Sequence, residues 1–243
     1  MGSFLKNVQV HGRSIEVLKT TDSTMYLGRL FGFASTHDVE LKNRIKKAWA
    51  KFNTFRAELT DKHYSLEHRM KLFGSVVQPT ILYGCCSWTL TTKRQQKLKT
   101  IQRKMLRQVL GVKRRVDKDG NVEDYLSWIV RATELAEEAR SYFKLPDWAE
   151  EAHRRKFAWA GHTARRHDGR WTRLVLQWSV EGARKRGHPV SRWSDSLHKF
   201  FKQICGKFAT LQDGNSFWMS LAENRESWAS LTEDYVNFAM GLC

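Results

Sequence analysis

The apolar residues of this chain recur at steps of three and four over long stretches, and this spacing limits its possible folds more than any other feature. After Asp38 the recurring positions are Leu41, Ile45, Ala48, Trp49, Phe52, Phe55 and Leu59. Residues at this spacing lie on one face of an α-helix, because the helix has about 3.6 residues per turn. We therefore expect one long amphipathic helix here, within a mainly α-helical protein.

Further helices are expected on both sides of a proline. Residues 66–77 have the same apolar spacing, and Pro79, which lacks a backbone donor, should bend or end that helix. Thr92 and Gln95 have the spacing of a capping box, and the helix that they open should stop at Gly111.

The second half of the chain continues this helical pattern. A more acidic helix is expected over residues 122–142, and Asp147 is a candidate N-cap for the helix that follows. The apolar residues of 206–243 also have helical spacing, so this acidic tail should dock on the rest of the protein.

The first 33 residues favour β-structure instead. β-branched residues on both sides of residues 11–13 predict a short β-hairpin, and residues 25–28 form a second extended stretch. The expected fold class is mainly α, with a short N-terminal β-hairpin.

The charge of the chain favours a polyanionic partner. Its 42 Lys and Arg exceed its 25 Asp and Glu, which gives a formal net charge of +17 and a pI near 9.9. Ten cations and no acid lie between Lys93 and Arg115, and eleven cations and two acids lie between Arg154 and Arg192. Such surfaces bind the sugar-phosphate backbone of nucleic acids by charge.

The candidate nucleic-acid-binding residues are cations of these two segments. They are Lys93, Arg94, Lys97, Arg103, Lys104, Arg107, Lys113, Arg114, Arg115, Arg154, Arg155, Lys156, Arg165, Arg166, Arg184, Lys185, Arg186 and Arg192. The alternative for the first segment is a helix face that is only solvated. For residues 184–186 it is a nuclear import signal.

Other classes of function lack their characteristic residues. The four cysteines include no Cys-x-x-Cys pair, and no cysteine lies close enough in sequence to His153, His162 and His167 to complete a zinc set. There is no Gly-x-Ser-x-Gly elbow, no glycine-rich phosphate loop and no apolar run of roughly 18 residues. We therefore expect no catalytic residue, metal site, cofactor or membrane contact. The expected location is intracellular, in the nucleus or cytoplasm.

Six short motifs follow one another along residues 26–195. They are Tyr26-Leu27-Gly28; Arg44-Ile45-Lys46-Lys47-Ala48; Pro79-Thr80-Ile81-Leu82-Tyr83-Gly84 with Trp88; Met105-Leu106-Arg107-Gln108-Val109-Leu110-Gly111; Arg154-Arg155-Lys156-Phe157-Ala158-Trp159-Ala160-Gly161-His162; and Arg184-Lys185-Arg186-Gly187-His188-Pro189 with Arg192-Trp193 and Asp195. In this order they resemble the region beyond the catalytic palm of non-LTR (LINE-type) retrotransposon reverse transcriptases. The resemblance covers most of residues 1–200.

The resemblance implies a helical, thumb-like bundle with a helical basic extension, which together grip a template–primer duplex. It places Tyr26, Leu27 and Gly28 near the primer end, although Tyr26 taken alone fits a buried strand end equally well. The implied partners are RNA, DNA or an RNA–DNA hybrid, together with a missing palm and fingers segment.

The sequence departs from the family in one decisive respect, because the metal-binding Tyr-x-Asp-Asp motif is absent. Polymerisation needs carboxylates that hold two divalent ions about 4 Å apart. We therefore expect the chain to be inactive alone, with Mg²⁺ implied only for the full-length parent enzyme. In addition, Cys86 stands where family members usually carry an acid, and His188 replaces the usual Arg.

These expectations divide the chain into four parts. They are a hairpin remnant bordering the palm (1–33), a thumb-like helical bundle (34–116), a helical linker and basic extension (117–204) and an acidic helical tail (205–243). The expected function is nucleic-acid binding by a non-catalytic C-terminal fragment of an RNA-directed DNA polymerase. The alternatives are an independent, maturase-like RNA-binding or ribonucleoprotein protein, and a translated relic with no selected role.

Overall fold

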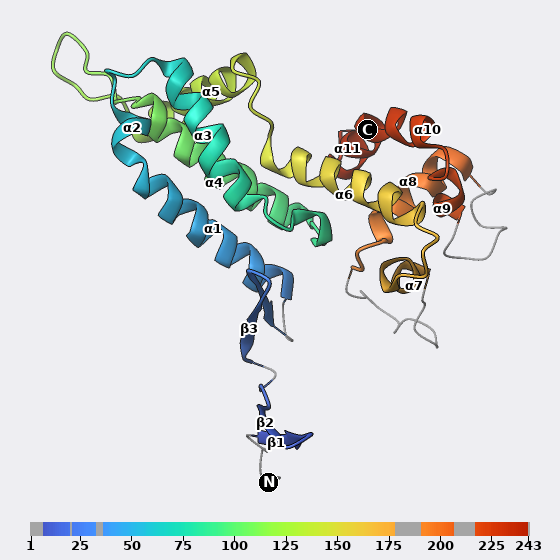
Figure 1. Ribbon diagram of the computed structural model, residues 1–243. Helices are drawn as coiled ribbons and strands as arrows, with labels where there is room; N and C mark the ends of the chain where they lie inside the picture. Colours follow the sequence, from blue (N-terminus) through green and yellow to red (C-terminus); the bar gives the residue numbers. More distant parts are fainter. Residues whose placement is uncertain (1–6, 20, 33–35, 178–190, 207–216, 243) are drawn as a thin grey trace.

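The computed structural model describes residues 7–19, 21–32, 36–177, 191–206 and 217–242. Helices dominate these ranges, and the strands form two antiparallel pairs near the N-terminus, which confirms the predicted fold class (Figure 1). The strands are β1 (Asn7–Val10), β2 (Arg13–Glu16), β3 (Ser23–Tyr26) and β4 (Arg29–Gly32). The helices are α1 (Thr36–Thr54), α2 (Arg56–Thr60), α3 (Leu66–Ile81), the 3₁₀ turn η1 (Cys85–Ser87), α4 (Thr92–Leu110), α5 (Tyr125–Tyr142), α6 (Trp148–Ala164), α7 (Trp171–Gln177), α8 (Asp195–Cys205), α9 (Phe217–Leu221), α10 (Arg225–Ser230) and α11 (Thr232–Met240).

The N-terminal region contains two hairpins where the sequence predicts one. The first, β1–β2, turns at His11 and Gly12 as expected. The second, β3–β4, turns at Leu27 and Gly28, whose φ angles are +46° and +76°. Leucine rarely adopts a positive φ, so Leu27 gives no turn signal, and Gly28 alone does not identify a hairpin in the sequence.

The long helix predicted from Asp38 to Leu59 is divided. α1 ends at Thr54, and Phe55, with φ −105° and ψ 23°, separates it from the short helix α2. Phe52 and Leu59 are both fully buried on either side of the break. The apolar period therefore continues across the break and conceals it in the sequence.

Pro79 does not end its helix, because α3 continues to Ile81. The proline ring is exposed, so the carbonyl of Ser75 that lacks an N–H partner lies on the solvent side, where water can satisfy it.

The helix ends follow the predicted caps in part. Gly111 ends α4 with φ +62°, and the Asp147 carboxylate accepts the N–H of Ala149 at 2.8 Å at the start of α6, both as predicted. The predicted capping box at Thr92 is wrong. Thr91 is the N-cap of α4, without a side-chain hydrogen bond, and Gln95 is buried and points to the C-terminal helices.

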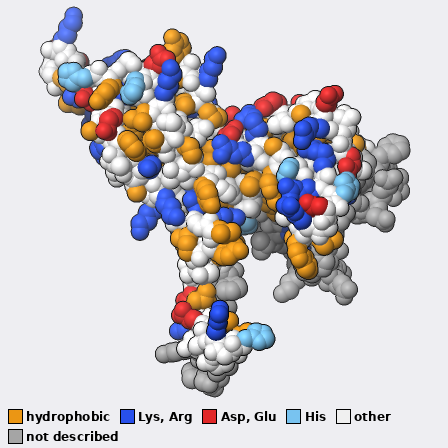
Figure 2. Space-filling view, viewed as in Figure 1, with side chains coloured by type: hydrophobic (Ala, Val, Ile, Leu, Met, Phe, Trp, Pro, Cys, Tyr) orange, Lys and Arg blue, Asp and Glu red, His pale blue; other side chains and the backbone are white. Residues whose placement is uncertain are grey.

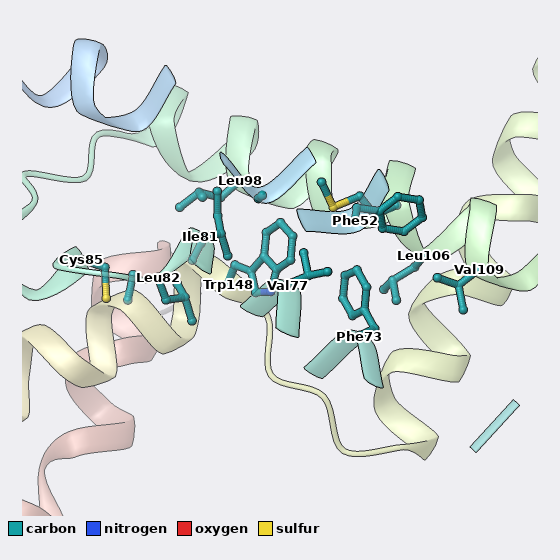
Figure 3. Packing of buried hydrophobic residues seen from close by; sticks show 14 of the residues in the cluster. Phe52, Phe73, Val77, Ile81, Leu82, Cys85, Leu98, Leu106, Val109 and Trp148 are labelled. Carbon is teal, nitrogen blue, oxygen red and sulfur yellow. The ribbon is translucent and has the colours of Figure 1, made fainter. Parts of the chain in front are cut away.

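A first hydrophobic cluster joins α1, α3, α4, α5 and the beginning of α6. Its centre is Trp148, which stacks on Phe73 with ring centres 5.8 Å apart and an interplanar angle of 10°. Figure 3 shows Trp148 among side chains of α3 and α4, with Val77 and Leu98 close to it. Burying each large side chain of this kind stabilises the fold by about 1.5–3 kcal/mol.

A second hydrophobic cluster joins the rest of α6 with α8, α9, α10 and α11. Phe157 of α6 stacks on Trp228 at 4.2 Å and on Tyr235 at 4.7 Å between ring centres. α6 therefore contributes residues to both clusters, and Figure 1 shows it running between the two groups of helices. None of the helices described above is long and apolar enough to cross a bilayer.

Candidate nucleic-acid interface

Three of the six motifs meet at the turn between β3 and β4. The carbonyl of Gly28 accepts a hydrogen bond from the Arg44 guanidinium, and the carbonyl of Leu27 accepts one from the Tyr83 hydroxyl at 2.9 Å. The Arg44 guanidinium also lies 4.5 Å from the centre of the Tyr83 ring. Residues far apart in the sequence therefore fix the hairpin on the helical bundle.

A buried carboxylate completes this anchor. Glu40 is 0% exposed, and it accepts hydrogen bonds from Arg44 Nε at 2.6 Å and from the backbone N–H of Leu30 at 2.7 Å. A buried carboxylate needs such partners, because leaving water without them is strongly unfavourable. Glu40 is absent from the sequence-based predictions, and the signal that could have found it is its i, i+4 spacing to Arg44 on α1.

The predicted primer-end residues lie at the exposed tip of the same hairpin. The side chains of Tyr26 and Leu27 are 63% and 73% exposed, so Tyr26 is not a buried strand end. Gly28 packs against Tyr83, whose hydroxyl would lie 3.7 Å from a Cβ at that position. Contact between this tip and a primer stays a prediction.

α1 and α4 run side by side in the same direction. Arg94 Nε lies 2.8 Å from Asp38 Oδ1 near the start of both helices. Farther along both helices, Lys104 Nζ lies 5.8 Å from the centre of the Trp49 ring. The two helices thus form one layer, whose inner side packs on the first hydrophobic cluster.

The outer side of this layer carries a row of lysines. At about 100° per residue, five of the exposed lysines of α1 and α4 fall on the side of each helix away from the cluster, whereas the exposed Lys51 lies over the Phe55 ring. We call this set the lysine face, and its members are Lys42, Lys46, Lys93, Lys97 and Lys104, all of them exposed. α4 contains no acid, and the two acids of α1, Asp38 and Glu40, are held by Arg94 and Arg44.

Two members of the lysine face, Lys42 and Lys46, are absent from the sequence-based set. The signal that could have found them is their i, i+4 spacing on the side of α1 opposite Ala48. From Lys93 to Lys104 the face extends about 16 Å at a rise of 1.5 Å per residue, which is roughly five base-pair steps of 3.4 Å.

The loop between α4 and α5 presents three further predicted cations. Lys113, Arg114 and Arg115 are all exposed, and the Arg114 guanidinium lies 5.5 Å from the centre of the Tyr125 ring. Figure 2 shows Lys and Arg side chains projecting from this loop, along the side of α1 and around α6 and α7. The loop cations are therefore accessible from solvent.

Other predicted cations of α4 are engaged within the protein. Arg94 pairs with Asp38 and also donates to the carbonyl of Thr89 at 2.7 Å. On the other side of the helix, Arg103 pairs with Glu137 of α5 at 2.5 Å. Arg107 donates to the Thr133 hydroxyl at 2.9 Å. These arginines position α1 and α5 against α4, and we leave them out of the lysine face.

The second basic segment is paired to a large extent with acidic residues. Arg154 donates to Glu233 of α11 at 2.8 and 2.9 Å and to Glu151 at 3.1 Å. Arg155 donates to Glu151 at 2.7 Å. The hydrogen bond from Arg154 lowers the pKa of the Glu233 carboxyl. The acidic tail therefore docks on this segment and offsets part of its charge.

The remaining predicted cations have varied surroundings. Lys156 is 2% exposed, so it cannot reach a phosphate on the outer surface. Arg165 donates to the carbonyl of Ala222 at 2.6 Å, Arg166 lies 3.8 Å from Asp168, and Arg192 is exposed. The predictions for Arg184, Lys185 and Arg186 lie outside the described residues.

The last motif contacts two earlier ones. The Trp193 indole N–H donates to the carbonyl of Cys86 at 2.7 Å, and its ring lies edge-on to Trp159, with centres 5.2 Å apart. Gly161 of α6 packs directly on Trp228. Trp193 therefore joins the second hydrophobic cluster, on which it packs, to the turn beside Cys85 of the first.

No group of three or more His, Cys, Asp or Glu side chains suited to a metal ion occurs in the ranges that the structure covers. The geometry of the lysine face is instead suited to a repeating anion.

No family model and no solved structure matches the chain. The chain is similar to a transposon-derived protein of Caenorhabditis elegans, with 29% identity over 219 residues. The match covers 88% of this chain and 71% of the worm protein. The similarity relates the chain to transposon-derived proteins.

Proposed function

We propose that the chain is a non-catalytic, nucleic-acid-binding part of a retrotransposon reverse transcriptase. In this proposal the lysine face lies along the backbone of an RNA, DNA or hybrid duplex, and the loop cations 113–115 extend the contact. The observation that carries the proposal is the arrangement of five exposed lysines on one side of the α1–α4 layer, whose acids are held by arginines.

Two further observations support the retrotransposon part of the proposal. The relative is transposon-derived, and the motifs that resemble LINE-type enzymes meet in space at the β3–β4 turn and at Trp193. The hairpin tip at Tyr26 would then face the palm of the full enzyme. Mg²⁺ and the polymerising carboxylates would belong to that palm.

The mechanism of binding is charge neutralisation. Each lysine that contacts a phosphate releases condensed counterions, so log K for duplex falls with log salt by about 0.9 per contact. Five lysine contacts predict a slope of roughly −4 to −5, and eight contacts, with the three loop cations included, predict a slope of about −7. The binding has no base specificity, because lysine contacts to phosphate carry no sequence information.

The test replaces Lys46 and Lys97 with glutamine and measures duplex affinity by fluorescence anisotropy between 50 and 300 mM salt. The double variant should bind at least tenfold more weakly near 0.1 M salt, and its salt slope should decrease by about 1.8. Lys71→Gln is the control, because Lys71 is an equally exposed lysine on α3 that pairs with Glu67. An unchanged slope in the double variant, or an equal loss in the control, would contradict the proposal.

A further inference from the structure

A cavity of about 170 Å³ lies between the segment before α4 and the helices α6, α8 and α11. Thr89, His153, Lys156, Ser196, Arg192 and Lys199 are among the residues that line it. The cavity is distinct from the lysine face, because none of the five lysines lines it. Arg94 lies between the cavity and the α1–α4 layer, since it donates to the carbonyl of Thr89 and pairs with Asp38 of α1.

Lys156 is a buried cation that forms no ion pair within the described parts of the chain, although the charge of the nearby Asp195 carboxylate acts on it. Its ammonium donates to the Ser196 hydroxyl at 2.9 Å and lies 4.9 Å from the centre of the Trp193 ring. Burial lowers its pKa to about 8, and the charge of Asp195 opposes that shift only in part. A buried cation is costly unless an anion compensates it, and a hydroxyl and a ring face do so only in part.

His153 offers an N–H donor at the same cavity. The Gln95 amide nitrogen lies 2.9 Å from His153 Nε2 and donates to the carbonyl of Ala239 at 2.9 Å. A carbonyl can only accept, so this Gln95 atom is the NH₂ group and His153 Nε2 is an acceptor. The ring proton therefore lies on Nδ1, which is buried without a hydrogen-bond partner in the described structure.

Thr89 adds a second donor of this kind. Its side chain is 6% exposed, and its Oγ1 is buried without a hydrogen-bond partner in the part of the chain that the structure covers. Buried polar groups are almost always paired, so two unpaired donors on residues that line one cavity favour a ligand that brings an acceptor to them.

The rim of the cavity is also cationic. Arg192 and Lys199 are exposed there, and Asp195, whose carboxylate accepts the backbone N–H of Arg192 at 2.8 Å, is the one acid among the described lining residues. Three cations thus face one carboxylate, which favours an anionic ligand.

We infer that this cavity binds a phosphoryl group, with Lys156, His153 Nδ1–H and the Thr89 hydroxyl as its inner donors. The volume has room for a group of several water-sized atoms but not for a nucleoside. A terminal phosphate fits better than a phosphate within a strand, because it has three free oxygens and only one attached sugar. The ligand is therefore either the terminal phosphate of a nucleic acid or free phosphate, and only the first source rests on the proposed function.

The first experiment titrates the full chain with inorganic phosphate at constant ionic strength, followed by ³¹P NMR and calorimetry. Saturable binding is expected in the native protein, with at least a fivefold loss of affinity in Lys156→Met and in Thr89→Val. Lys202→Met, which removes an exposed lysine of α8 outside the cavity, should retain the native affinity. Lys156→Met could lose affinity through a folding defect. Thr89→Val avoids this problem, because valine has nearly the shape of threonine and lacks only the hydroxyl.

The second experiment compares one short single strand with a 5′-phosphate, a 3′-phosphate or hydroxyls at both ends. A preference of at least fivefold for a phosphorylated end, lost in Thr89→Val, supports the terminal phosphate as ligand. Saturable phosphate binding without any binding of single strands or of duplex supports free phosphate and overturns the proposed function. Strand binding that needs the lysine face, without phosphate binding or end preference, overturns the phosphoryl site and leaves the proposed function standing.

Discussion

The Tyr83 hydroxyl donates a hydrogen bond to the carbonyl of Leu27 across 2.9 Å, so the residue that follows α3 by two positions holds the tip of the β3–β4 hairpin. Removing the hydroxyl in Tyr83→Phe should cost about 0.5–1.5 kcal/mol, the usual net contribution of one hydrogen bond. Amide exchange of residues 23–32 should become faster, while exchange in α4 is unchanged. Tyr64→Phe, in the turn before α3, is the control, and equal exchange in both variants would contradict the assignment.

Glu40 is the carboxylate on which the anchor depends. Glu40→Ala leaves the Arg44 guanidinium buried without its acid, and the free energy of unfolding should fall by about 3–5 kcal/mol. Urea unfolding followed by circular dichroism measures the change. Glu67→Ala breaks an exposed ion pair with Lys71 and should leave the midpoint unchanged. If both variants lose the same free energy of unfolding, burial does not explain the contribution of Glu40 to stability.

Gly161 is required by the close approach of α6 and Trp228. A Cβ at this position would collide with the Trp228 indole nitrogen, which donates to the carbonyl of Phe157 at 3.0 Å. Gly161→Ala should therefore destabilise the protein by about 1–3 kcal/mol or more. Gly74→Ala is the matched control, because its Cβ meets only the flexible end of Leu145 at 2.8 Å. Thermal unfolding should show a clear loss for Gly161→Ala and a small change for Gly74→Ala.

His153 should make the protein sensitive to mild acid. Burial, and to a smaller extent the charge of Lys156, lowers its pKa from 6.5 to about 3. The folded state therefore binds this proton less readily than the unfolded state, so stability is complete above pH 6.5 and falls as the pH drops toward 3.

At pH 5 the loss of stability from His153 should be on the order of 2 kcal/mol. Urea midpoints at pH 7.5 and pH 5 measure it, and His153→Gln should remove most of the difference between them. His63→Gln, an exposed histidine, should keep the native pH dependence. The same pH dependence in His153→Gln and in the native protein would assign the acid sensitivity to other groups.

Local signals in the sequence were sufficient for most of the helices. Apolar spacing and the residues Gly111 and Asp147 predicted where α4 ends and α6 begins, because these features act within one or two turns. The break at Phe55 was missed because the apolar period continues across it, and the turn at Leu27 was missed because Tyr83 and Arg44, both distant in sequence, hold it.

The candidate interface was predictable only in part, for a related reason. A run of like charges shows that cations are abundant, but pairing depends on which acids other helices bring near. Arg103 has no acid in its own segment and pairs with Glu137 of α5, and Arg154 pairs with Glu233 of α11 in addition to Glu151 of its own helix. Lys42 and Lys46 joined the lysine face only because α1 lies parallel to α4.

The continuity of α6 has a mechanical consequence. Trp148 at its beginning belongs to the first hydrophobic cluster and Phe157 to the second, and no break interrupts the helix between them. The two halves of the protein cannot pivot about a loop there, because a change of angle would require hydrogen bonds of the helix to open. A force on the C-terminal helices would therefore be transmitted along α6 to the α1–α4 layer that carries the lysine face.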